Sequence, residues 1–182
     1  MNTLLIFLIL SIPVILVSLR NLFNPRSHGF YRLLGWECLV WLLAANYRYW
    51  FAHPFKLHHL ASWTLLLVAT YVVLAGAVRL KKMGKAANTR EDKSLFGFEK
   101  TTELVDSGIY SLIRHPLYGS LIFLTWAVFL KNPTLTLLAV AVPATVFFYI
   151  TARFDEKECI AYFGEKYREY MTRSKMFVPY IF

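Results

Sequence analysis

The chain has 182 residues, of which 57% are hydrophobic and 17% aromatic, and its mean hydropathy is +0.46. This composition is too apolar for an ordinary soluble domain and fits one compact membrane domain with several spans. The formal net charge is +9. Because the basic residues lie in the gaps between apolar runs, this charge does not indicate a nucleic-acid partner.

Five apolar runs are candidates for membrane-spanning helices. They cover residues 3–19, 33–51, 60–80, 116–130 and 134–151. The first three approach the roughly 20 residues that a helix needs to cross a bilayer. The fourth would reach only about 22 Å, against a hydrocarbon thickness of about 30 Å, so its start is predicted either to lie in the interface or to be extended by the residues before Pro116. No cleavage site of the A-x-A type follows the first run, which we expect to be a retained span.

The order of these runs predicts the fold class. The turn Lys131-Asn132-Pro133 joins the fourth and fifth runs into a helical hairpin. The predicted fold is all-α, a single integral-membrane helical bundle over residues 1–182. It has about five transmembrane helices and an amphipathic cytoplasmic helix near the C-terminus.

The basic residues predict the orientation. Of the 20 lysines and arginines, 17 lie on one side of the predicted spans, and only Arg48, Lys56 and Lys131 lie on the other. By the positive-inside rule, the N-terminus is expected outside and the C-terminus in the cytoplasm, with the plasma (inner) membrane as the expected location. Residues 81–115 and 153–182 then meet at the cytoplasmic surface, where we expect a site.

The segment RFDEKECIAYFGEKYREYM, after the fifth run, is predicted to form the amphipathic helix. Its apolar stripe begins at Glu156, while Glu158, Glu165 and Glu169 fall on another face. A carboxylate at the head of an apolar stripe faces the bundle and requires a cation. The candidate cations are Arg114, Arg153 and Arg173. Spacing alone leaves a functional carboxylate and a structural salt bridge equally open.

A second polar group lies at the start of the fourth run, in SLIRHPLYGS. Pro116 is typical of the first turn of a helix. Arg114 and His115 at this position are either anchors for lipid phosphates or part of a site.

Together these segments resemble a known superfamily. The first carries L-V-x-x-G-x-Y-x-x-x-R-H-P-x-Y, and the second carries an acidic pair followed by F-G-x-x-Y-x-x-Y. Over about residues 76–182 the chain resembles the integral-membrane methyltransferases, which include isoprenylcysteine carboxyl methyltransferase and the phospholipid N-methyltransferases. The superfamily usually has Glu-Glu at the acidic pair, where this chain has Asp155-Glu156.

The resemblance implies S-adenosylmethionine as cofactor, bound in a cytoplasmic pocket between the two segments. The implied cofactor-binding residues are Leu104, Val105, Gly108, Tyr110, Arg114, His115, Pro116, Tyr118, Asp155 and Glu156. Glu156 is also expected in a catalytic role with Arg153 and Arg173, either of which would orient an anionic group of the substrate. A Rossmann-type methyltransferase is excluded independently, because the sequence has no G-x-G-x-x-G motif and no alternation of strands and helices.

The resemblance implies methyl transfer to a lipophilic small molecule or a membrane lipid, whose nucleophile is a thiol, a carboxylate, an amine or a phospholipid head group. Two alternatives remain open at this point. The C-terminal pattern also resembles NADPH-dependent membrane sterol reductases, and a non-catalytic membrane protein would keep the same motifs.

Two further expectations concern polar residues away from these motifs. Glu37 lies inside the second run, and an intramembrane acid is a functional candidate by default. We expect its partner to come from another helix, with Arg79 and Lys82 as candidates. No metal site is expected.

Overall fold

The computed structural model describes residues 2–19, 24–25, 27–85 and 101–181, and residues 86–100 of the predicted cytoplasmic loop lie outside this description. The regular elements in the described part are helices, which confirms the all-α prediction there. The α-helices are α1 (Thr3–Ser18), α2 (His28–Asn46), α3 (Leu57–Met83), α4 (Pro116–Phe129), α5 (Leu135–Phe163) and α6 (Glu165–Arg173).

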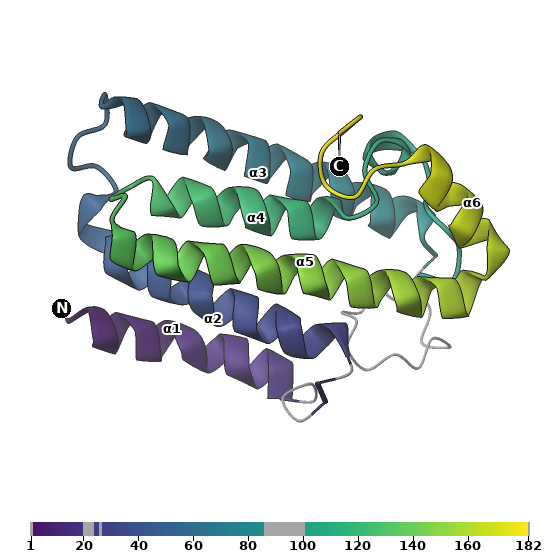
Figure 1. Cartoon of the computed structure of the whole chain (residues 1–182), viewed down its shortest axis with the longest axis horizontal. Helices are drawn as coiled ribbons and strands as arrows, with labels where there is room; N and C mark the ends of the chain where they lie inside the picture. Colours follow the sequence, from purple (N-terminus) through teal and green to yellow (C-terminus); the bar gives the residue numbers. More distant parts are fainter. Residues whose placement is uncertain (1, 20–23, 26, 86–100, 182) are drawn as a thin grey trace.

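The first five helices run side by side with nearly parallel axes (Figure 1). Contacts give the order α1, α2, α5, α4, α3 across the bundle. The short α6 and the C-terminal segment lie at one end, beside the end of α3 and the start of α4 (Figure 1). Segments that flank the α4–α5 hairpin in the sequence therefore meet at this end.

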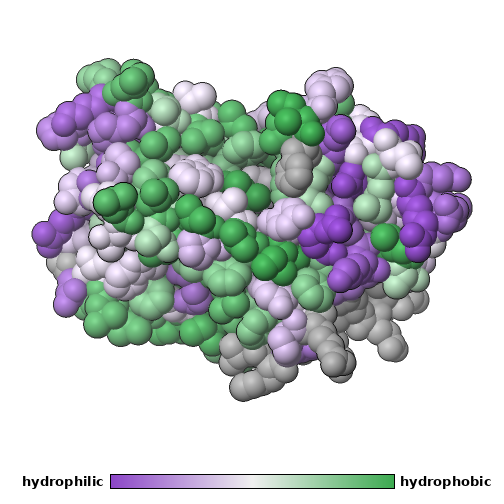
Figure 2. Space-filling model, viewed as in Figure 1, coloured by the Kyte–Doolittle hydropathy of each residue, from purple (hydrophilic) through white to green (hydrophobic). Residues whose placement is uncertain are grey.

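Among the described residues, the helices α3 and α5 are long and apolar enough to cross a membrane. Helices α1 and α4 are apolar but shorter. Apolar side chains cover much of the visible surface along the helices, and polar side chains gather at the ends, most densely around α6 (Figure 2). The length and apolar character of α3 and α5 thus support two of the five predicted transmembrane helices. For α1, α2 and α4, a membrane crossing stays a prediction.

Two predicted boundaries differ from the structure. The second run was expected over residues 33–51, but α2 begins at His28 and ends at Asn46, followed by a 3-10 turn over Tyr47–Tyr49. The predicted amphipathic helix is split, because α5 continues to Phe163 and α6 begins only at Glu165. Gly164 separates them with φ 62° and ψ −135°, a conformation that glycine adopts far more readily than other residues.

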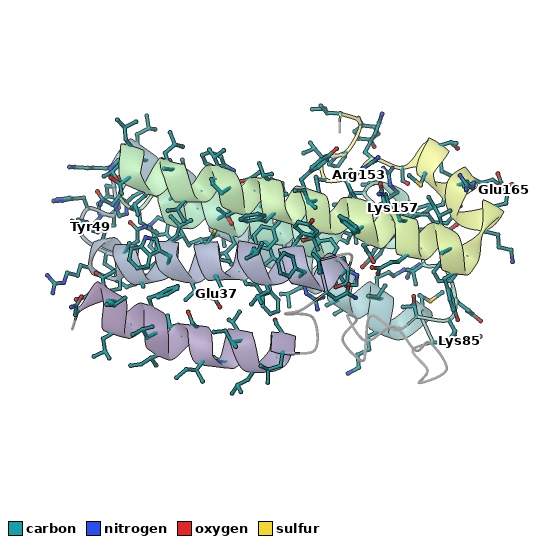
Figure 3. All side chains as sticks on the ribbon, turned by 60° about the horizontal axis from the view of Figure 1, so that its bottom comes forward. Glu37, Tyr49, Lys85, Arg153, Lys157 and Glu165 are labelled. Atoms are coloured by element: carbon teal, nitrogen blue, oxygen red, sulfur yellow. The ribbon has the colours of Figure 1, made fainter. Side chains whose placement is uncertain are left out.

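Glu37 lies between α1 and α2 (Figure 3), so the expectation of a partnership with Arg79 or Lys82 was wrong. Ser11 of α1 donates a hydrogen bond to Glu37 Oε2 at 2.6 Å. Arg79 instead contacts Ser107, more than 20 residues along the chain in the predicted cytoplasmic loop.

The end of the bundle away from α6 buries a different cation. Lys131, in the α4–α5 turn, is 1% exposed. Its Nζ lies 3.3 Å from the ring centroid of Trp63 and 5.0 Å from that of Trp50. This Nζ atom has no hydrogen-bond partner among the described residues. This cation–π cluster ties the turn to α3 and to the chain after α2.

Candidate functional site

The R-H-P segment is held against the C-terminal segment by backbone hydrogen bonds. The Arg114 N–H donates to the Lys175 carbonyl at 2.7 Å, and the His115 N–H donates to the Met176 carbonyl at 3.1 Å. The Lys175 N–H donates to the Leu112 carbonyl at 3.0 Å. Pro116 then begins α4, so these backbone hydrogen bonds hold the side chains of Arg114 and His115 at the N-terminus of that helix.

A buried polar network links this segment to α5. Arg114 Nε donates to Glu156 Oε1 at 2.8 Å, and Arg153 Nη1 donates to Glu156 Oε2 at 3.1 Å. His115 Nδ1 lies 3.3 Å from Asp155 Oδ2. The side chains of Glu156 and His115 are each 3% exposed, whereas that of Asp155 is 16% exposed. Two of the three cations expected for Glu156 are therefore its partners.

The network shifts the pKa of His115. Burial disfavours the charged imidazolium, but the hydrogen bonds and negative charges of Asp155 and Glu156 outweigh this effect, so the pKa of His115 is raised. Burial also raises the pKa of Tyr167, which stays a neutral phenol. The site therefore combines an imidazole whose charged form is stabilised by carboxylates with neutral aromatic rings.

These groups border a pocket between α3, α4, α5, α6 and the loop before α4. We call it the donor pocket, after the methyl donor that the superfamily resemblance leads us to expect there. It holds about 620 Å³ of space free of protein atoms, including its open mouth. Its lining residues are Leu80, Thr101, Leu104, Val105, Tyr110, Arg114, His115, Pro116, Leu117, Tyr118, Asp155, Cys159, Phe163, Tyr167 and Tyr170.

The structure brings most of the expected cofactor-binding residues to this pocket. The exceptions are Gly108 and Glu156. Gly108 has φ +66°, and a Cβ atom added at this position would lie 3.3 Å from Arg79 Nε. The turn beside the pocket therefore requires a glycine. Glu156 lies behind the wall and holds Arg114 and His115, while its neighbour Asp155 forms part of the wall.

The two arginines expected in catalytic roles lie at the protein surface. Arg153 is 52% exposed and contacts Glu156. Arg173 is 62% exposed and donates a hydrogen bond to Asp106 rather than to Glu156. Figure 3 shows Arg153 at the same end as Lys85 and Glu165, with Tyr49 at the other.

Sequence reasoning missed seven lining residues. They are Leu80, Thr101, Leu117, Cys159, Phe163, Tyr167 and Tyr170. Three of these are the aromatic positions of F-G-x-x-Y-x-x-Y, which helical spacing alone placed on the apolar stripe. Their signal was available, because the superfamily motif joins them to the acidic pair, whose Asp155 also lines the pocket. Leu80 and Thr101 carried no such signal, because only the tertiary fold brings the end of α3 to the pocket.

Side-chain anchors fix the loop that closes the pocket. Arg79 of α3 donates from Nε and Nη2 to Ser107 Oγ, at 3.2 and 2.7 Å. The Tyr170 hydroxyl of α6 donates to the Tyr110 carbonyl at 2.6 Å. The loop is thus attached to the helices on both sides of the pocket.

A second, apolar cleft lies between α4 and α5 under the C-terminal segment. It is lined by Gly119, Ile122, Phe123, Thr145, Val146, Tyr149, Phe177 and Val178. Phe177 packs with Tyr118 of the donor pocket, and its ring centroid lies 6.2 Å from that of His115. The two cavities are therefore separated by little more than these side chains.

Comparison with known proteins bears on this geometry. A family model described as phospholipid methyltransferase matches residues 57–166, which is more than half of the chain. The chain belongs to the phospholipid methyltransferase family. The match includes α3, α4, α5 and the R-H-P segment, so the family region contains most of the donor pocket.

Relatives support the same membrane methyltransferase superfamily. Methanethiol S-methyltransferase of Pseudomonas deceptionensis is 31% identical over 120 residues, 65% of this chain and 42% of that protein. Protein-S-isoprenylcysteine O-methyltransferase B of Arabidopsis thaliana is 34% identical over 87 residues, 46% of this chain and 43% of that protein. The matches thus span about two fifths of these relatives' length. No solved structure is significantly similar to the chain.

Proposed function

We propose that this chain transfers a methyl group from S-adenosylmethionine to a lipophilic, membrane-soluble acceptor at the cytoplasmic membrane surface. The observation that carries the proposal is the donor pocket, in which the R-H-P-x-Y motif, Asp155 and the aromatic F-G-x-x-Y-x-x-Y positions face one cavity. Family membership favours methyl transfer over the reductase alternative.

The lining fits the groups that such a donor carries. Bound S-adenosylmethionine supplies an electrophilic methyl group on a sulfonium, together with an ammonium. The Asp155 carboxylate suits the ammonium, and the rings of Tyr110, Tyr118 and Phe163 suit a sulfonium. His115 Nε2 is buried and lies 3.5 Å from Glu156 Oε1, so this ion pair orients the imidazole in the wall of the pocket.

The chain's contribution to the reaction is alignment. Methyl transfer is an in-line displacement, and holding two reactants near contact distance is worth about 7–11 kcal/mol. The backbone clamp on Arg114 and His115 and the anchored loop hold the donor side rigid. Gly119, in the wall of the apolar cleft, directly follows Tyr118 in α4. Phe177, in the same wall, packs with Tyr118.

The acceptor class follows from the cleft. Its lining contains no charged side chain, so it suits the hydrocarbon part of an acceptor rather than a charged head group. The names of the relatives include a thiol, methanethiol, and an isoprenylated cysteine. We propose a thiol or a carboxylate on a lipophilic molecule as the first acceptors to test, with amines and phospholipid head groups second.

We further propose that five helices cross the bilayer, with the N-terminus outside and the donor pocket on the cytoplasmic side of the plasma (inner) membrane. The support is the distribution of 17 of 20 basic residues and the position of the donor pocket at the α6 end, where hydrophilic side chains gather (Figure 2). Reporter fusions at the two termini test this, and reporters on the same side would contradict it.

The test of the main proposal is calorimetric titration of the detergent-purified chain with S-adenosylmethionine and with NADPH. We expect saturable 1:1 binding of the first and none of the second, with affinity strongly reduced in His115→Ala. Binding of NADPH alone would support the reductase alternative. Binding of S-adenosylmethionine without turnover on a panel of lipophilic thiols, carboxylates and amines would support a non-catalytic protein.

A further inference from the structure

His28, the first residue of α2, lies outside the family match and outside every motif that the sequence presents, yet it lies close to the donor pocket. It is fully buried against α5. Its Nδ1 lies 2.5 Å from Glu158 Oε2, and its backbone N–H donates to Glu158 Oε1 at 3.4 Å. The Ser27 side chain makes no capping hydrogen bond, so Glu158 serves as the acceptor at the start of α2.

The sequence placed Glu158 on a different face from Glu156 and indicated no partner for it. Glu158 is 25% exposed and pairs with a buried histidine of another helix. The distance of 2.5 Å is that of a direct hydrogen bond. It leaves no room for a metal ion between the two atoms, since zinc takes ligands at about 2.0–2.2 Å on each side.

The pair is connected to the donor pocket through Asp155. A ring nitrogen of His28 and carboxylate oxygens of Asp155 and Glu158 all lie within 4.8 Å of one another. Asp155 lines the donor pocket and its Oδ2 lies 3.3 Å from His115 Nδ1. Asp155 is therefore placed between two histidines, one in the pocket wall and one behind it.

The charges in this turn of α5 explain why a histidine is needed there. Residues 155, 156 and 158 are all acidic, and neighbouring carboxylates disfavour each other's ionised form. Arg114 and Arg153 offset the charge of Glu156. His28 Nδ1 lies 2.5 Å from Glu158 Oε2, so His28 offsets the second carboxylate and reduces the repulsion on Asp155.

We propose that His28 is a positioning residue of the donor site, which holds Glu158 and thereby leaves Asp155 ionised for the ammonium group of the donor. This inference rests on the proposed function. His28 touches neither donor nor acceptor and acts through Glu158 and Asp155.

The experiment is calorimetric titration of the purified full chain with S-adenosylmethionine for four proteins: wild type, His28→Gln, Glu158→Gln and the double variant. His28→Gln leaves Glu158 charged and without its histidine, so we expect donor affinity to fall about three- to tenfold. In the double variant the repelling carboxylate is also gone, so affinity should return to within about twofold of wild type. His58→Gln, a histidine near the other end of the bundle that contacts the Leu130 carbonyl, is the matched control and should bind as wild type.

The pH dependence provides a second readout. Burial lowers the pKa of His28, but the hydrogen bond to Glu158 and the charges of Asp155 and Glu158 outweigh burial and the opposing charge of Arg32, so this pKa is raised. A group with a raised pKa contributes below that pKa, and its contribution is lost as pH rises through it. The affinity advantage of wild type over His28→Gln should therefore be largest near pH 6 and disappear at alkaline pH.

The possible results distinguish failure of this inference from failure of the proposed function. Unchanged donor affinity in His28→Gln, or a double variant no better than the single one, would overturn the inference and leave a purely structural clamp. If His28→Gln does not fold, the wild-type pH profile compared with that of Glu158→Gln decides, because only the former should weaken through the His28 titration. If the wild-type chain binds no S-adenosylmethionine, the proposed function fails, and this inference fails with it.

Discussion

The two ends of the bundle bury cations in different ways. At the α6 end, Arg114 is paired with the carboxylate of Glu156 at 2.8 Å and borders a cavity. At the other end, Lys131 lies against the rings of Trp63 and Trp50. The ionic network adjoins open space in which a ligand can meet its carboxylates, whereas the aromatic cluster is filled by its own lysine. Burial of a charge therefore does not mark a ligand site unless a cavity adjoins it.

The largest expected effect is the difference in stability between two variants, in which the buried cation at each end of the bundle is replaced by methionine. Arg114→Met should destabilise the protein by about 3–5 kcal/mol, because it leaves Glu156 buried without its closest cation. Lys131→Met should stay within about 1 kcal/mol of wild type, because the lost cation–π attraction is offset by no longer burying an ammonium without a hydrogen bond. Thermal melting in detergent measures both. Equal losses would show that the two ends are energetically alike.

A second effect separates the adjacent acids. Asp155 lines the donor pocket and Glu156 lies behind it, so Asp155→Asn should weaken donor binding with little change in melting temperature. Losing one charge-assisted hydrogen bond is worth about 1.5–3 kcal/mol, roughly ten- to a hundredfold in affinity.

Glu156→Gln is the control for this pair. It should lower the melting temperature more than Asp155→Asn does, because its side chain is buried among Arg114, Arg153 and His115. A Glu156→Gln protein that melts as wild type but no longer binds S-adenosylmethionine would mean that Glu156 itself contacts the donor, as the superfamily resemblance implies.

Lys131→Met should also leave donor affinity within about twofold of wild type. Lys131 lies in the α4–α5 turn, at the end of α4 opposite Pro116 and the donor pocket. Calorimetry on the same protein sample measures this. A larger change would mean that the aromatic end and the donor pocket are coupled through α4.

The smallest expected effect is at Arg173. Its contact with Asp106 is an exposed ion pair, and such pairs contribute about 0.2–1 kcal/mol and weaken with salt. Arg173→Lys keeps the charge but not the planar guanidinium, so it loses only part of this weak contact, and donor affinity should change less than about 1.5-fold. A drop in turnover of more than tenfold at unchanged donor affinity would instead assign Arg173 to the acceptor.

The sequence predicted the elements of the site better than their relations. Helix type and the pairing of the two polar segments followed from hydrophobic periodicity and from the hairpin between them. The position of Gly164 as a helix break, with α5 reaching Phe163, did not follow, because apolar periodicity continues through the glycine. His28 could not be found from the sequence, because no local pattern ties it to Glu158, 130 residues away. The Ser11 partner of Glu37 was missed for the same reason.

The length of α5 bears on the lipid environment in which this protein works. At about 1.5 Å per residue, its 29 residues extend for about 43 Å, against a hydrocarbon core of about 30 Å. With its apolar part in the bilayer, the last turns carry Asp155 and Phe163 out to the head groups. Hydrophobic mismatch then becomes a variable of the reaction, because a thicker bilayer would draw the apolar cleft deeper relative to the lipid carbonyls. In bilayers of graded acyl length, the KM for a lipophilic acceptor should change while the affinity for S-adenosylmethionine stays constant.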